Sequence, residues 1–157
     1  MEKLVMNEYM HYFKNEVIKY HSRKEVIEKS MKIMKEQGLD YETIYKVKDQ
    51  MEKENKLQFS NGEVKAFRAW QNTIRNNRDA EVIEMSEFLW DEEVAGFICA
   101  LRTAGVDRFY FTNTSTAVME NLHGFVAAGC KIGKTVTLEK DELFREPQFD
   151  LGIEIIL

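Results

Sequence analysis

The chain has few of the residues that mark disulfide-rich, metal-binding or membrane-spanning proteins. Its 157 residues include two cysteines and one proline. Cys99 and Cys130 stand alone without CxxC spacing, which argues against a disulfide framework, and we expect both to be small, buried core residues. The longest apolar run, residues 94–101, is far shorter than the ~20 residues that span a bilayer. We therefore expect no membrane partner.

The distribution of charged residues bears on where the protein is located and on whether it binds nucleic acid. Residues 1–20 carry scattered charges instead of the basic segment and apolar stretch of a signal peptide, so we expect a cytoplasmic protein. The net charge of −5 is unevenly divided, with 16 Lys and Arg against 13 Asp and Glu in residues 1–80 and 6 against 14 in residues 81–157. Because the acidic half would repel a phosphate backbone, we do not expect a nucleic-acid partner; a basic patch around Trp70 in the helical half is the alternative.

The N-terminal region, residues 1–78, has the pattern of about four helices. Apolar residues recur at intervals of three and four up to Tyr20, where we expect the first helix to end. Ser22 and Glu25 form a capping box that predicts the second start, and Gly38 suits the left-handed residue after its end. The two further predicted starts are an N-cap at Asp40 and a capping box formed by Ser60 and Glu63.

The C-terminal region, residues 79–157, alternates between strand and helix patterns. Capping residues and glycines separate the elements, and we expect Asp91 to cap one helix and Asn113–Thr116 to cap the other. Arg108–Thr112 is aromatic on both faces, as expected of a central strand. The expected strands are 81–89, 108–112, a strand after Cys130 and a closing strand over 151–157, with a loop over 140–148 and helix stops at Gly105 and Gly129.

These patterns predict an α/β (α+β) fold. N-terminal helices pack with a C-terminal β-α-β-α-β-β unit of about four strands, mostly parallel, with an antiparallel edge strand, because strand-helix-strand crossovers are almost always right-handed. The last two strands are expected to pair as a hairpin. We expect regions 1–78 and 79–157 to form one compact domain.

From Asp91 onward, the run DEEVAGFICALRTAGVDRFYFTNTSTAVMENLHGFVAAGCKIGKTV resembles a family of small, uncharacterised proteins from Firmicutes that are often carried on mobile elements. The shared pattern is a helix ending in Ala104-Gly105, the strand Phe109–Asn113, a Ser/Thr turn, and a helix that closes on Gly129-Cys130. These motifs are mostly structural stops and caps. The resemblance implies a mobile-element context and carries no known activity.

One edge of the predicted sheet is the candidate ligand site. In open α/β sheets, ligands bind where parallel strands end and helix N-termini gather, and hydroxyls beside free helix amides attract phosphate. The chain has neither a phosphate-binding loop nor a dinucleotide fingerprint, and Asn, Ser and Thr at such positions are also ordinary helix caps. The candidate residues are Trp90, Asp91, Asn113, Thr114, Ser115, Thr116 and His123.

Other groups of polar residues give weaker indications of a metal or catalytic site. The acidic residues between Glu81 and Glu93 lack the spacing of a calcium loop and suit a solvated strand face followed by a helix N-terminus. His11 and His21 do not share a helix face, and His123 has no partner that the sequence alone identifies. We therefore predict no catalytic residue, no metal site and no cofactor.

Two classes of function remain. The first is a non-enzymatic interaction or regulatory protein, such as a mobile-element accessory or a protein that interferes with host defence, acting on another protein or on itself. The alternative is a binder of, or enzyme acting on, small molecules or nucleotide phosphates, using the strand-end crevice. The absence of a recognisable catalytic constellation favours the first.

Overall fold

The computed structural model describes residues 4–143 and 146–157, and the chain divides into two compact units. One unit comprises Met1–Met10 and Phe59–Leu157 and is called the sheet unit; the other, His11–Gln58, is called the helical hairpin. The elements in chain order are α1 (Glu8–Glu36), α2 (Tyr41–Glu54), α3 (Asn61–Asn76), β1 (Ile83–Met85), α4 (Asp91–Thr103), β2 (Arg108–Phe111), α5 (Val118–Ala127), β3 (Lys131–Leu143) and β4 (Glu146–Ile156).

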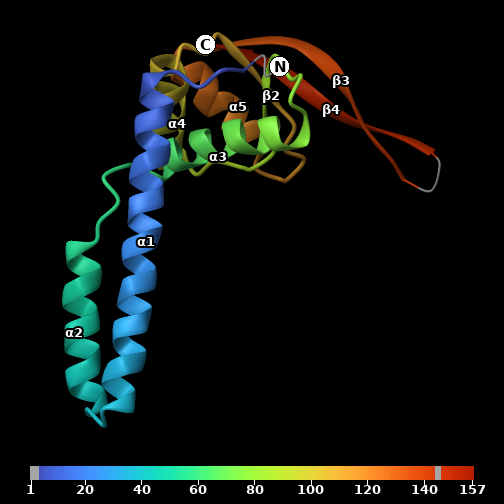
Figure 1. Cartoon of the computed structure of the whole chain (residues 1–157). Coiled ribbons are helices and arrows are strands. Elements are labelled where there is room, and N and C mark those ends of the chain that lie inside the picture. The colour runs from blue at the N-terminus through green and yellow to red at the C-terminus, as the bar shows by residue number, and fades with distance from the viewer. Residues whose placement is uncertain (1–3, 144–145) are drawn as a thin grey trace. The chain divides into compact units, whose positions relative to one another are not determined.

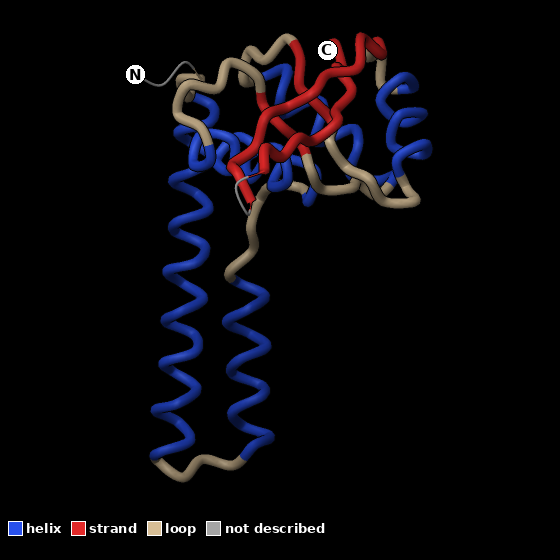
Figure 2. The backbone as a smooth tube through the Cα atoms, turned by 90° about the vertical axis from the view of Figure 1, so that its right-hand side faces the viewer, coloured by secondary structure: helices blue, strands red, loops and turns tan. Residues whose placement is uncertain are grey.

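The helical hairpin is built from α1 and α2, which lie side by side (Figures 1 and 2). The predicted break near Tyr20 is wrong, because α1 runs unbroken through Ser22 and Glu25. No Gly or Pro interrupts that stretch, and a single serine costs a helix interior well under 1 kcal/mol. The described part of residues 1–78 therefore holds three helices instead of about four.

The other helix boundaries of this region are confirmed. Gly38 has a φ of +80°, in the left-handed range that follows a helix end. The Asp40 carboxylate accepts a hydrogen bond from the Thr43 amide at 3.2 Å and caps α2. At the start of α3, the Ser60 hydroxyl accepts from the Glu63 amide at 3.3 Å while Glu63 accepts from the Ser60 amide at 3.2 Å. Both halves of the predicted capping box are present.

The sheet has four strands in the order β1-β2-β4-β3, which confirms the predicted α+β class and mixed sheet. β2 pairs parallel with β1 and antiparallel with β4, and β3 pairs antiparallel with β4. Three strands therefore point the same way. The strand of opposite direction, β4, lies inside the sheet instead of at the expected edge, because it inserts between β2 and β3.

β3 and β4 continue together beyond the end of β2 as a long two-stranded ribbon (Figure 1). Most of the expected loop over residues 140–148 therefore belongs to strands. Pro147 falls within a shift of the strand register, between the Lys140–Gln148 and Leu143–Glu146 pairs, where the amide that proline lacks is not needed by a regular ladder. At the other end of the unit, β1 has only three residues, Ile83–Met85, instead of the nine expected.

The core of the sheet unit is a cluster of four phenylalanines. Phe109 and Phe111 of β2 face the same side of the sheet and contact Phe125 of α5 edge-to-face, at centroid distances of 5.3 and 5.2 Å. Phe97 of α4 meets Phe109 in the same way at 5.3 Å. All four rings are buried. The two helices therefore cover one face of the sheet, with β2 at its centre, as the sequence predicts.

The two cysteines differ in their surroundings. Cys130 is buried as expected, and burial raises the pKa of its thiol. Cys99 is exposed, so its expected place in the core is wrong. The buried positions of α4 include Phe97, Ile98 and Leu101, and Cys99 lies about 100° around the helix from Ile98, on the outer side.

Helices α3 and α4 cross at unusually close range because each contributes a glycine. A Cβ atom on Gly62 would overlap the carbonyl oxygen of Glu93 and come within 2.8 Å of the Phe97 amide nitrogen. A Cβ on Gly96 would approach the Ser60 hydroxyl at 2.5 Å. α3 also covers the free edge of β1, where the Thr73 hydroxyl accepts from the Glu84 amide at 3.0 Å. An edge that could pair with another strand is thereby closed.

The N-terminal residues of the sheet unit are held by polar contacts. The Tyr9 hydroxyl donates to Glu63 of α3 at 3.0 Å, and the Asn7 side-chain amide donates to the Thr103 carbonyl at 3.2 Å. Burial, followed by the hydrogen bond to Glu63, raises the pKa of Tyr9 to about 12. The phenol is therefore neutral over the whole physiological range.

Gly62→Ala should destabilise the sheet unit by about 2 kcal/mol or more, because the added methyl forces apart two backbones that cannot yield locally. Chemical denaturation measures this as a lower midpoint. The matched control is Asn61→Ala, an exposed position one residue earlier, which should change stability by about 0.5 kcal/mol at most. Equal stability of Gly62→Ala and the parent chain would refute the close crossing.

Candidate functional site

The carboxyl ends of β1 and β2 meet at one edge of the sheet. The two strands are parallel and in register from Ile83 opposite Phe109 to Met85 opposite Phe111. Beyond them, the Thr112 amide donates to the Met85 carbonyl at 2.9 Å. The Asn113 side-chain amide donates to the Ser86 carbonyl at 2.8 Å, which fixes the two loops that leave the strands.

The polar turn after β2 is occupied by its own hydrogen bonds. The Asn113 side-chain oxygen Oδ1 accepts from the Ser115 amide at 3.0 Å and from the Ser115 hydroxyl at 2.5 Å. The Ser115 hydroxyl in turn accepts from the Ala117 amide at 3.3 Å. The N-cap of α5 is Ala117, without a side-chain cap, so the predicted capping of α5 by Asn113–Thr116 is wrong. These residues stabilise the turn before the helix.

Two adjoining hollows open at this edge. One has a volume of about 450 Å³ and is lined mostly by residues of polar type, among them Ser86 and Asp150. The other, of about 480 Å³, has mostly apolar walls that include Phe111, Val118 and Ile153. Residues common to both hollows are Asn113, Thr114 and Leu151. Together they form the strand-end crevice, a shallow groove with one polar side and one apolar side.

The predicted site residues separate into two groups. Asn113, Thr114 and Ser115 line the strand-end crevice, whereas the remaining four line neither of its hollows. Asp91 is the first residue of α4 instead of its N-cap, which is Trp90, with 58% of its surface exposed. The four residues away from the crevice are Trp90, Asp91, Thr116 and His123, all exposed.

A buried asparagine that the sequence analysis missed holds this edge together. The Asn121 side chain accepts from the Leu89 amide at 2.9 Å and donates to the Leu89 carbonyl at 2.6 Å. In the loop between β1 and α4, Asn121 thus satisfies the backbone of Leu89 as a neighbouring strand would. Its position offered a signal, because Asn121 lies at helical spacing from Val118 and Phe125, on the apolar side of α5.

Several members of the acidic run between Glu81 and Glu93 form ion pairs. Glu93 is buried and accepts from Lys65 at 2.6 Å and from the Trp90 amide at 3.0 Å. Lys65 also donates to the Phe88 carbonyl at 3.0 Å, and both charged side chains are largely buried, at 14% and 7% exposure. Two further pairs join Glu84 to Lys140 at 2.6 Å and Glu87 to Arg68 at 2.7 Å.

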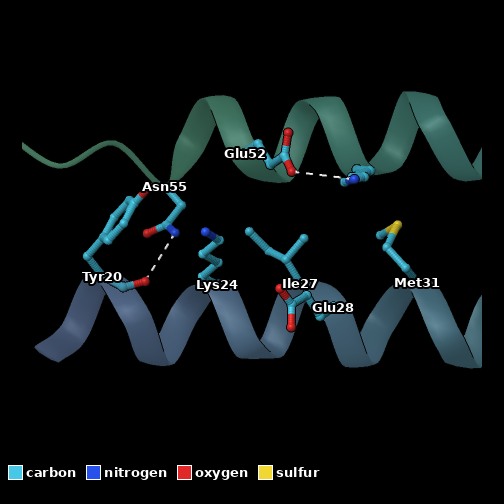
Figure 3. A pocket seen from close by; sticks show the side chains of 8 residues that line it. Tyr20, Lys24, Ile27, Glu28, Met31, Glu52 and Asn55 are labelled. Atoms are coloured by element: carbon cyan, nitrogen blue, oxygen red, sulfur yellow. Dashed lines mark hydrogen bonds and ion pairs between the residues drawn. The ribbon is translucent and has the colours of Figure 1, made fainter.

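The helical hairpin has a separate hollow, of about 520 Å³, between α1 and α2 (Figure 3). The Asn55 side-chain amide donates to the Tyr20 carbonyl at 3.3 Å and ties the end of α2 to α1. The Lys24 side chain points toward α2, and Lys48 pairs with Glu52 at 3.8 Å. The residues that line this hollow are Tyr20, Lys24, Ile27, Glu28, Met31, Lys48, Glu52 and Asn55.

A second, smaller hollow of about 280 Å³ lies on the other side of the same helix pair. It shares only Ile27 and Asn55 with the first, and Val26 on its wall is about 200° around α1 from Lys24. Its walls are mostly apolar. They are formed by Arg23, Val26, Ile27, Met51, Glu54 and Asn55.

The described residues hold neither a membrane-spanning helix nor a cluster of metal ligands. In residues 4–143 and 146–157, no helix combines the length and apolar character needed to cross a membrane. Within the same ranges, no three His, Cys, Asp or Glu side chains gather closely enough to hold a metal ion.

The sheet unit thus defines a class: an α+β domain in which two helices cover one face of a mixed four-stranded sheet whose last strand inserts beside the second. A family model described as a domain of unknown function, DUF7698, matches residues 65–150, which is more than half of the chain. The chain therefore belongs to this family. No curated protein and no solved structure matches the chain significantly. The helical hairpin, residues 11–58, lies outside the matched segment.

Asn121→Ala should destabilise the sheet unit by about 2 kcal/mol or more, because it leaves the Leu89 amide and carbonyl buried without partners. Asn121→Asp should also be destabilising, since a carboxylate still accepts from the amide but faces the carbonyl oxygen. Denaturant titration of the two variants measures both effects, with Glu120→Ala, at the exposed neighbouring position, as control. A loss of stability no larger than that of the control would show that the hydrogen bonds between Asn121 and Leu89 contribute nothing.

Proposed function

We propose that this chain is a non-enzymatic interaction protein that binds another protein molecule through its helical hairpin. One observation carries the proposal: α2 has no buried residue, although it is a 14-residue helix with apolar residues along its length. In residues 11–58, the only buried large apolar side chains are Phe13 and Ile27. An isolated helix of this length is marginal in water, and most helices gain their stability by burying an apolar face.

The exposed apolar side chains of the hairpin support the proposal. Half of the sixteen large apolar side chains exposed in the described chain lie within residues 11–58. Val26 and Ile33 of α1 are 57% and 54% exposed, and their spacing of seven residues places them within about 20° of each other on the helix. Exposed apolar side chains that share a helix face are suited to packing against another protein.

The cellular setting is part of the same proposal. The resemblance of residues 91–136 to small proteins of Firmicutes supports a mobile-element accessory, or a protein that interferes with host defence, acting in the cytoplasm. In this role the chain would act by occupying a surface of another protein, which needs no catalytic group. Membership of a family of unknown function is compatible with this setting.

Val26→Lys should abolish binding of the natural partner while leaving the chain folded, because the residue is exposed and the lysine places a charge on the apolar surface. Tagged chain recovered from its native cells should carry a stoichiometric partner protein, and the variant should lose at least about nine-tenths of it. His21→Lys is the matched control, since it adds the same charge at an exposed position of α1 about 140° away. A persistently solitary monomer would contradict the proposal.

The strand-end crevice supports a second candidate function, binding of a small molecule. Its two hollows share Asn113, Thr114 and Leu151 and join polar to apolar walls, an arrangement that suits a ligand with a polar head and an apolar body. Against this candidate, the Asn113 side chain already has hydrogen-bond partners in Ser86 and Ser115, and the Ser115 hydroxyl has one in Asn113. We therefore place it second.

A thermal-shift screen with nucleotides and phosphorylated metabolites tests the crevice. A ligand at about 100 times its dissociation constant adds about 2.7 kcal/mol of stability and raises the melting temperature. Thr114→Trp should fill the hollows and remove the shift, whereas Thr137→Trp, at an exposed position of β3 outside both hollows, should keep it. No shift with any compound would exclude this candidate for the ligand classes screened.

A further inference from the structure

One side of the helical hairpin combines apolar side chains with a groove, and we call it the Val26 face. It is defined by Arg23, Val26 and Ile33 of α1 and by Val47, Met51 and Glu54 of α2. Val26, Ile33 and Val47 are exposed, and the hollow of about 280 Å³ runs between Val26 and Met51. The opposite side of the hairpin carries Lys24, Glu28, Lys48 and Glu52 and is polar.

The contacts between α1 and α2 show which residues of the two helices lie at the same level along the helix axes. The hydrogen bond from Asn55 to the Tyr20 carbonyl sets the end of α2 beside the middle of α1. Because the helices run antiparallel, Arg23 and Glu54 lie at one level, on opposite walls of the same hollow. Val26 and Met51 follow at the next level, and Ile33 and Val47 lie farther along, toward the turn that joins the helices.

We propose that the occupant of the Val26 face is a second copy of this chain, and that two hairpins stack face to face as a four-helix bundle. The inference rests on the proposed function. A two-fold axis parallel to the helices preserves the level of every residue and places α1 of one copy over α2 of the other. Val26 then packs against the partner's Met51, and the partner's Val47 lies at a level between Val26 and Ile33. In this dimer, α2 of each copy buries apolar side chains that are exposed in the single chain.

Charge complementarity selects this occupant and this arrangement. α1 carries seven Lys and Arg against five Glu, whereas α2 carries three Lys against four Asp and Glu. Stacking α1 on α2 of the partner therefore brings together surpluses of opposite sign, while stacking α1 on α1 would repel. The same two-fold axis brings Arg23 opposite the partner's Glu54, twice in the dimer. Arg23 makes no ion pair within the described part of the chain.

Sedimentation equilibrium of the full chain over about a hundredfold range of concentration tests the proposal. The parent chain should show a monomer–dimer equilibrium. Arg23→Glu and Glu54→Arg should each raise the dissociation constant about tenfold or more, and the double variant should restore it to within about threefold of the parent value. Lys24→Glu is the matched control: the same charge change, one residue away on the polar side, should have no effect. Circular dichroism verifies that all variants keep their helices.

The possible results separate this inference from the proposed function. A chain that is monomeric at every concentration but carries a stoichiometric foreign protein from native cells overturns the second copy and keeps the interaction role. A monomer without any partner overturns both. A dimer in which the double variant fails to recover, or in which Lys24→Glu weakens association as much as Arg23→Glu, overturns the stacking of α1 on the partner's α2.

Discussion

The packing of Phe125 against three other phenylalanines is the contact on which the rest of the sheet unit depends. Phe125 of α5 contacts Phe109 and Phe111 of β2 and Phe97 of α4. One cluster therefore fixes two helices and the central strand. β2 has only four residues, so its pairing with β1 and β4 extends over a short length. Edge-to-face pairs add about 0.5 to 1.5 kcal/mol each to the free energy of burial. The cluster therefore also determines where the strand ends lie.

Polar residues at those strand ends serve the architecture that the cluster imposes. Asn113 and Ser115 satisfy the backbone of a turn, Asn121 replaces a strand neighbour for Leu89, and Glu93 binds Lys65. Each arrangement solves the same problem, which is to supply partners for backbone groups and charges that folding removes from water. Polar residue types in a strand-end loop are therefore weak evidence for chemistry until the atoms that remain without partners are known.

Local signals in the sequence predicted local structure well and global arrangement less well. The capping box of Ser60, the left-handed glycines and the central strand at Phe109 depend on neighbours a few residues away, and all are confirmed. The insertion of β4 between β2 and β3, the length of the ribbon and the burial of Asn121 depend on residues far apart in sequence. The false break at Ser22 arose because a capping box is also compatible with a helix interior. Pattern alone does not distinguish these two cases.

The helical hairpin raises a question of stability that the sheet unit does not. In α2, the ion pairs Glu42–Lys46 and Asp49–Lys53 are exposed at positions four residues apart, and each contributes only about 0.3 to 0.5 kcal/mol. Together with the Asp40 cap they cannot replace a buried face, and the hollow beside Lys24 and Lys48 further reduces the contact between the helices. Burial of the Val26 face against a second copy would supply what is missing. Under the proposed dimer, association therefore adds to the stability of α2, and the temperature at which this segment unfolds rises with protein concentration.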